Sequence, residues 1–215
     1  MFLDPYNTPG FKRSLFNAIV APRPIGWIST LNPDGTANLA PFSQFNLVST
    51  APPVVMFSCN TPDDRPAKDT LANVRQTGEF VTNLATWDLR EAMNMTSSPC
   101  PHGQDEFELA GLQKAACTYV RAPRVAASPA NLECRVIQIV EIAPEHPGET
   151  ASHVVFGRVV GVHLADAYVT PEGRFDTEKA RPLTRLGGLQ YAAAGPIFEL
   201  PSRFARAGAA EPPAR

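Results

Sequence analysis

Short apolar runs of β type alternate with proline- and glycine-rich turns along most of the chain. Few of these runs have the length or the 3.6-residue period of a buried helix. The pattern predicts a mainly β protein with strands at 25–31, 36–40, 54–58, 79–85, 112–120, 132–142 and 153–165.

Two of the runs carry more detailed signals. The sequence N-P-D-G at 32–35 favours a tight β-turn, so residues 25–40 are expected to form a hairpin. In the run 132–142, Leu132, Cys134 and Val136 share one face until the alternation slips. Such a slip indicates a bulge or a bend in a long strand.

Helical patterns are short and fall at the connections. They are expected at Pro9–Val20, at Pro66–Gln76 ending near Gly78, and at Asp88–Met95 with Asp88 as a cap. A doubly wound α/β fold would need a long helix between consecutive strands, and none is predicted. The pattern favours a closed or partly closed antiparallel barrel with short peripheral helices.

Composition supports one ordinary globular unit. The chain has 215 residues, 44% of them hydrophobic, with 22 prolines and 14 glycines. We expect a single domain at 1–204 and a disordered tail at 205–215. The formal charge of −2 predicts no nucleic-acid partner, and the absence of a long apolar run predicts no membrane segment. The scattered cysteines suggest reduced thiols and a cytoplasmic location: Cys59, Cys100, Cys117 and Cys134.

Several common chemistries have no motif in this chain. There is no G-x-G-x-x-G dinucleotide fingerprint, no P-loop and no G-x-S-x-G nucleophile elbow. The acidic pairs Asp63-Asp64 and Asp105-Glu106 have the pattern of solvated loop charges. We expect no metal site, because the histidines lack zinc-type spacing: His102, His146, His153 and His163.

The segment 38–45, N-L-A-P-F-S-Q-F, is the first candidate site. Pro41 has no N–H to donate, so the ladder is expected to stop or bulge there and to leave backbone groups for a ligand. Phe42 would supply apolar contact and Ser43 a hydroxyl. The alternative is a simple β-bulge beside core phenylalanines.

The segment 65–73, R-P-A-K-D-T-L-A-N, is the second. It opens a predicted helix, where free N–H groups and the helix dipole favour an anion. Arg65, Lys68 and Thr70 would strengthen a phosphate site, and the Ser29-Thr30 pair offers further hydroxyls. The alternative is an exposed, capped surface helix.

The order of motifs is more specific than either segment alone. The chain carries P-R-P-I-G-W-I-S-T, N-L-A-P-F-S, K-D-T-x-x-N and G-E-F-V-T-N, followed by H-V-V-F-G-R-V and L-G-G-x-x-Y. Over residues 15–192 this resembles the flavin reductase-like, FMN-binding split-barrel family, and particularly its longer members related to flavoredoxin. The periodicity by itself does not indicate a flavin.

The resemblance implies a role for each matching position. His153 would lie near the flavin and a nicotinamide, as a tentative catalytic residue; the alternative is a barrel-rim histidine bonded to backbone. The remaining positions would bind FMN: Ser29 and Thr30 at the phosphate and ribityl group, Asn38, Ala40, Pro41, Phe42 and Ser43 along the isoalloxazine, Ser58, Cys59 and Asn60 at the ribityl chain, and Lys68, Asp69 and Thr70 at the phosphate, assisted by Asn73.

The resemblance also implies a function. We expect a homodimeric oxidoreductase that transfers hydride from NAD(P)H to flavin, with no side-chain acid or base strictly required. Two alternatives from the same family are a non-catalytic FMN-binding electron carrier and the reductase component of a two-component monooxygenase, each with a protein partner. A binding module for another phosphorylated ligand is a further alternative.

Overall fold

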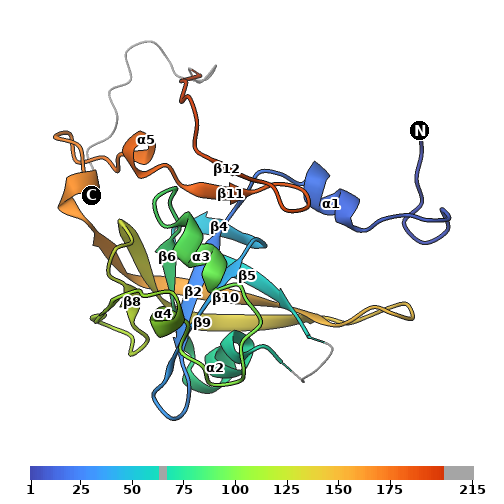
Figure 1. The fold of residues 1–215 in the computed structure, drawn as a ribbon, viewed down its shortest axis with the longest axis horizontal. Coiled ribbons are helices and arrows are strands. Elements are labelled where there is room, and N and C mark those ends of the chain that lie inside the picture. The colour runs from blue at the N-terminus through green and yellow to red at the C-terminus, as the bar shows by residue number, and fades with distance from the viewer. Residues whose placement is uncertain (63–66, 201–215) are drawn as a thin grey trace.

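The computed structural model describes residues 1–62 and 67–200 (Figure 1). The predicted tail at 205–215 and the start of the predicted helix at 66 lie outside these residues. The helices are α1 Ser14–Ile19, α2 Asp69–Thr77, α3 Arg90–Met95, α4 Glu106–Leu109 and α5 Thr177–Ala180, with a 3₁₀ turn η1 at Asp166–Tyr168. The strands are β1 Arg23–Pro24, β2 Gly26–Leu31, β3 Ala37–Phe42, β4 Phe45–Thr50, β5 Pro53–Asn60, β6 Glu79–Leu84, β7 Lys114–Ala115, β8 Arg124–Val125, β9 Ala130–Ile142, β10 Ser152–Leu164, β11 Leu183–Arg185 and β12 Tyr191–Ala193.

A seven-stranded antiparallel sheet dominates the molecule (Figure 1). Its strands lie in the order β3-β2-β6-β9-β10-β5-β4. The predicted hairpin is confirmed, because β2 pairs with β3 around the 32–35 turn. The predicted bulge is also confirmed, since the β9–β10 register shifts between Phe156 and Gly157 and again between Val159 and Gly161.

The chain connection between β3 and β4 shows that the sheet curls into a barrel. These two strands occupy opposite ends of the sheet order, yet only Ser43 and Gln44 separate them in sequence. The curl brings β2 against β4, where a Cβ on Gly26 would lie 2.6 Å from the ring of Phe45. The seam between β3 and β4 carries no strand pairing among the described residues, so the barrel is split.

Alternate residues of β2 and β3 pack into two separate hydrophobic cores, one on each face of the sheet. Ile28 and Phe42 point into the barrel, where Phe42 packs against Phe57 with ring centres 5.0 Å apart. Trp27 and Leu39 point to the outer face and pack beneath α3 and α4. Because both faces are covered, the β2–β3 hairpin is almost fully buried and is a rigid base for side chains at its edge.

Proline at position 41 does not interrupt β3 as expected. The β2–β3 register continues from Ala37 to Phe42, with Pro41 opposite Trp27. β3 is an edge strand of the sheet, and a proline whose missing N–H faces the open edge costs no ladder hydrogen bond. The expected stop or bulge at Pro41 was therefore wrong.

Two further local predictions also need correction, and one strand was not predicted. The run 112–120 forms only the two-residue β7, because the N–H groups of Thr118, Tyr119 and Val120 donate to the carboxylate of Glu133 rather than to a strand. α3 begins after Leu89 with no side-chain cap, so Asp88 does not cap it. β4 was not predicted, since its mostly exposed residues show no apolar alternation.

The predicted end of α2 is confirmed. Gly78 follows the last helical residue in the left-handed conformation, with φ of 69°, where a side chain would be strained. Within the described part of the chain, no helix is long and apolar enough to span a bilayer. Cys59, Cys117 and Cys134 are free thiols.

Candidate functional site

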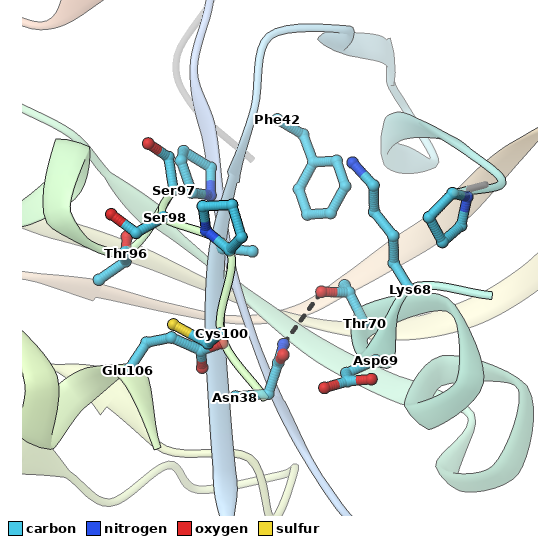
Figure 2. Close-up of a pocket in the computed structure, with 14 residues that line it drawn as sticks. Asn38, Phe42, Lys68, Asp69, Thr70, Thr96, Ser97, Ser98, Cys100 and Glu106 are labelled. Carbon is cyan, nitrogen blue, oxygen red and sulfur yellow. Dashed lines mark hydrogen bonds between the residues drawn. The ribbon is translucent and has the colours of Figure 1, made fainter. Parts of the chain in front are cut away.

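A cavity of about 330 Å³ lies between β3, the start of α2 and the segment that follows α3 (Figure 2). This volume falls within the usual range for small-molecule sites. Three separate parts of the chain line it: Asn38, Ala40, Pro41 and Phe42 of β3, Pro62 with Lys68, Asp69 and Thr70 around α2, and Thr96, Ser97, Ser98, Pro99, Cys100 and Glu106. The two segments singled out in the sequence therefore meet in one cavity.

The α2 side of the cavity is cationic. The chain enters the helix at Lys68 in an extended conformation, and the Lys68 side chain makes no capping hydrogen bond. The ammonium of Lys68 lies 5.7 Å from the ring centre of Phe42, so it bridges the two predicted segments. Thr70 lines the same side of the cavity, with its hydroxyl turned toward Asn38 (Figure 2). A positive side chain at a helix N-terminus favours an anionic ligand.

A buried polar network fixes the wall of the cavity. Asn38 donates from Nδ2 to the hydroxyl oxygens of Thr30, at 3.1 Å, and Thr70, at 3.0 Å. Asn73 donates in turn to Thr30 at 3.0 Å and to Asn32 at 2.7 Å. This network joins β2, β3 and α2. Thr30 and Asn73 therefore support the wall from behind rather than lining it.

The segment after α3 forms the third wall, which the sequence analysis did not predict. Thr96 receives a hydrogen bond from the indole N–H of Trp27 at 2.9 Å and donates to the carbonyl of Met93 at 2.8 Å. His102 lies 2.8 Å from the carboxylate of Asp69, which ties this segment to α2. The adjacent hydroxyls of Thr96, Ser97 and Ser98 were the sequence signal that could have identified it.

The acidic pair Asp105-Glu106 is not the solvated loop charge that was expected. Asp105 caps α4 by accepting the N–H of Phe107 at 3.0 Å. Glu106 is 8% exposed, lines the cavity and accepts the N–H of Leu39 at 2.8 Å. Burial raises the pKa of the Glu106 carboxyl above its ordinary value.

The other predicted contacts do not line this cavity in the described residues. Ser29 is fully buried and donates to the carbonyl of Pro123 at 2.6 Å. Ser43 lies in the two-residue β3–β4 link. At the end of β5, Cys59 is opposite His153 of β10, and burial raises the pKa of its thiol to about 11. Beside it lie Ser58, whose N–H bonds to Gln44, and the exposed Asn60.

His153 is buried rather than presented at the rim. Its Nε2 lies 3.5 Å from the carboxylate of Glu141, and its Nδ1 has no hydrogen-bond partner among the described residues. An unpartnered buried ring nitrogen is uncommon and has a free energy cost. The alternative reading, a rim histidine whose side chain bonds to backbone, therefore has no support among these residues.

Comparison with known proteins connects this geometry to a family. The model of the flavin reductase-like domain matches residues 20–182. The chain belongs to the flavin reductase-like family. The match includes all the elements that build the cavity, and it confirms the family resemblance of the motifs.

Relatives and solved structures agree with this membership. An uncharacterized protein of Aquifex aeolicus is 39% identical over 176 residues, which is 82% of this chain and 86% of the relative. Nitrilotriacetate monooxygenase component B from Bacillus cereus has a TM-score of 0.85 at 29% identity, covering 93% of this chain and 98% of that one. Flavoredoxin of Desulfovibrio vulgaris has a TM-score of 0.73 at 19% identity, covering 94% of this chain and 98% of that one. It shows the same split-barrel fold.

Proposed function

We propose that this member of the flavin reductase-like family binds FMN in the cavity between β3 and α2 and reduces it with hydride from NADH or NADPH. One observation carries the proposal. Phe42 of β3 and Thr70 of α2 line the same cavity, and the ammonium of Lys68 lies beside the Phe42 ring (Figure 2). A flat apolar ring joined to a phosphate by a polyhydroxyl chain needs these two kinds of surface at one site.

The residues present fit the two ends of FMN. Lys68, Thr70 and the first N–H groups of α2 would hold the phosphate, with Asp69 turned toward His102. Ala40, Pro41 and Phe42 would lie along the ring. We assign the ribityl contacts to the segment of Thr96, Ser97 and Ser98, which lines the wall of the cavity that faces Phe42 and Thr70 (Figure 2).

When bound, FMN supplies a ring that accepts a hydride and later releases its electrons. The chain's own residues bind, orient and shield that ring. The β3 wall would cover one side of the ring and exclude water from it, because its residues are backed by the buried β2–β3 strands. No acid–base pair is needed for this chemistry.

We propose that the other predicted contacts support the site from behind or beside the cavity: Ser29, Thr30, Ser43, Ser58, Cys59, Asn60 and Asn73. His153 is kept as the proposed nicotinamide-side residue. If it has that role, His153→Gln will raise the KM for the nicotinamide and leave FMN affinity unchanged. An unchanged KM would remove it from the proposal.

A partner reductase for a separate monooxygenase is the second candidate function. The observation that favours it is the similarity to nitrilotriacetate monooxygenase component B. A flavoredoxin-like electron carrier is the third, supported by the shared fold alone.

We further propose a homodimer in the cytoplasm. Figure 1 shows α1 on an N-terminal arm that extends away from the barrel, and α1 has no buried residue. Ile19 is 67% exposed on this short helix. A second copy would cover that apolar surface. Size-exclusion chromatography with light scattering tests this, and a monomeric mass would contradict it.

The visible spectrum of the purified protein tests the function. We expect a yellow protein whose colour is bleached anaerobically by NADH or NADPH. Turnover of excess free flavin would identify a reductase, whereas a single bleaching event would identify a carrier. A colourless protein with no thermal shift on adding FMN would contradict every FMN-based alternative.

A further inference from the structure

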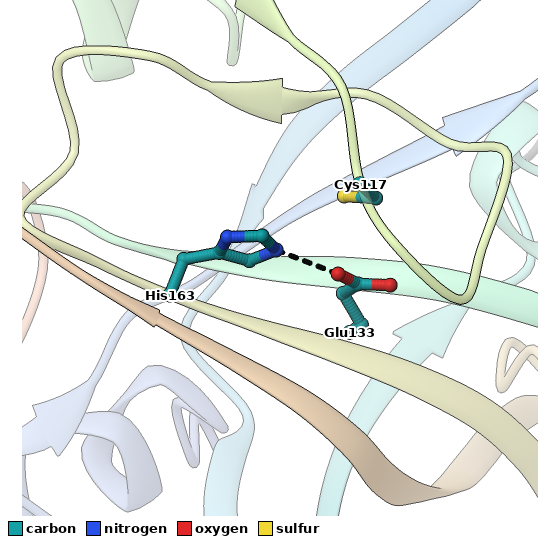
Figure 3. Close-up of side chains that lie close together, drawn as sticks. All are labelled: Cys117, Glu133 and His163. Atoms are coloured by element: carbon teal, nitrogen blue, oxygen red, sulfur yellow. Dashed lines mark hydrogen bonds and ion pairs between the residues drawn. The ribbon is translucent and has the colours of Figure 1, made fainter.

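Three side chains with metal-ligating atoms meet at a second place, away from the cavity residues. Cys117 lies in the loop between β7 and β8, Glu133 on β9 and His163 on β10 (Figure 3). Their ligand atoms all lie within 4.8 Å of one another. The spacing rules used on the sequence did not identify this group, because its members are 16 and 30 residues apart.

The barrel positions the carboxylate and the imidazole together. Glu133 is opposite Gly161, and His163 follows two residues later on the same face of β10. A Cβ at Gly161 would lie 3.2 Å from the carboxyl carbon of Glu133, so glycine leaves room for the carboxylate there. His163 Nε2 lies 2.6 Å from Glu133 Oε1.

Three backbone donors hold the carboxylate in place. Glu133 accepts the N–H groups of Thr118 at 2.8 Å, Tyr119 at 2.5 Å and Val120 at 3.0 Å. Burial opposes the charge of Glu133, but these bonds and the one from His163 outweigh it and lower the pKa of the carboxyl. A fully buried carboxylate that stays ionised and is held by outer hydrogen bonds is the usual arrangement of a metal-binding carboxylate.

We propose that Cys117, Glu133 and His163 form a three-ligand site for a divalent cation of the zinc class. Thiolate, imidazole and carboxylate together suit Zn²⁺, and three protein ligands leave a fourth position for water. Thr118, Tyr119 and Val120 lie outside the ligands and orient the carboxylate.

The binding step displaces protons. Burial raises the pKa of the Cys117 thiol to about 11, so the thiol proton must leave to the buffer when the ion binds. His163 can bind the ion only through a ring nitrogen that carries no proton, so binding through Nε2 would replace the hydrogen bond between Nε2 and Glu133. Arg124, whose charge favours the thiolate, opposes a second positive charge nearby.

The site also has a route to solvent. His163 lines a neighbouring cavity of about 450 Å³ together with Arg124, Ser128 and Asn131. The His163 side chain is 25% exposed. An ion can therefore approach the ligands from the His163 side without unfolding β9 or β10.

Metal titration of the full chain, as purified and treated with a chelator, tests the proposal. We expect dialysis against Zn²⁺ to leave one ion per chain that the Cys117→Ser and His163→Gln variants lack. Since losing an outer partner alone costs about 10–100-fold in metal affinity, losing a ligand should cost about 100-fold or more. Co²⁺ as a probe should give a thiolate charge-transfer band in the wild-type minus Cys117→Ser difference spectrum.

His146→Gln is the matched control, because His146 is exposed and lies outside the group. It should retain the ion and the Co²⁺ band. Circular dichroism of each variant separates loss of ligand from loss of fold. The proposal is overturned if folded Cys117→Ser binds Zn²⁺ as tightly as the wild type. It is equally overturned if the wild type takes up no stoichiometric ion, which would leave Glu133 and His163 as a structural pair.

Discussion

Glu106 of α4 accepts the backbone N–H of Leu39 on β3, with 2.8 Å between that nitrogen and Oε2. β3 is an edge strand, so a side chain takes the place that a neighbouring strand would fill. The carboxyl lines the cavity at the same time. One residue thus satisfies the open edge of the barrel and shapes the site.

The first prediction concerns the pH dependence of stability at Glu106. Burial raises its folded-state pKa above the ordinary value of 4.5, so the folded protein binds this proton more tightly than the unfolded chain. This contribution to the free energy of unfolding is present at low pH and is lost as pH rises through the folded-state pKa. In Glu106→Gln the amide oxygen can still accept the N–H of Leu39. Because the amide does not titrate, this loss of stability with rising pH should disappear.

Urea denaturation of wild type and Glu106→Gln across pH 4 to 8 measures that difference. Glu108→Gln is the control, because the Glu108 side chain is 80% exposed. Glu106→Ala should lose about 1–3 kcal/mol by leaving the buried N–H unpaired. If the free energies of unfolding of wild type and Glu106→Gln change with pH in parallel, the Glu106 carboxyl does not have the raised pKa described above.

The second prediction concerns Lys68 and FMN. Removing a charged hydrogen-bond donor costs about 1.5–3 kcal/mol, so Lys68→Ala should weaken FMN binding roughly 10- to 100-fold. Fluorescence titration of FMN measures the Kd. Lys12→Ala, at an exposed position outside the cavity, should bind as the wild type does. Equal affinity in Lys68→Ala and wild type would remove the phosphate assignment.

The third prediction concerns Asn38, which donates to both Thr30 and Thr70. Asn38→Ala leaves the buried Thr70 hydroxyl without its donor and removes one of the two donors to Thr30, so it should lower the free energy of unfolding by about 1–3 kcal/mol. It should also weaken FMN binding, because Thr70 loses the partner that orients it. Chemical denaturation and FMN titration measure the two effects. Asn46→Ala on exposed β4 should change neither, and a silent Asn38→Ala would argue against the network.

The fourth prediction concerns the barrel seam. A Cβ on Gly26 would lie 2.6–2.9 Å from side-chain atoms of Phe45, which is closer than carbon atoms pack. Gly26→Ala should therefore destabilise the protein by about 1–3 kcal/mol. Gly26→Ala in a Phe45→Leu background should cost less, and a double-mutant cycle measures this coupling. Additive effects of the two substitutions would mean that β2 and β4 do not meet there.

The main-sheet strands other than β4 were predictable because their residues alternate or are apolar throughout. The hairpin at Ile28 and the bulge near Val136 follow from local patterns alone. β4 did not follow, since its pairing with β5 is set by the barrel rather than by its own residues. The run 112–120 looked like a strand, but the distant Glu133 takes its N–H groups.

The candidate site was predictable in part for the same reason. Phe42 and Lys68 belong to segments whose local chemistry is readable, and the family motif indicates that they act together. The third wall depends on tertiary contacts such as the Trp27–Thr96 bond. Cys117 and His163 likewise meet only because the β7–β8 loop packs against the paired strands β9 and β10. Local sequence patterns do not indicate such contacts between residues that are far apart in the chain.

Phe42 belongs at once to the cavity wall and to the interior of the barrel, where its ring touches Phe57. A ligand that contacts Phe42 would therefore pack against the rigid core of the barrel. Any adjustment to cofactors of different shape must come from the opposite wall, the hydroxyl-bearing stretch after α3. Substitutions in the wall after α3 would therefore change which ligand fits, and they would leave the packing of the barrel at Phe42 unchanged.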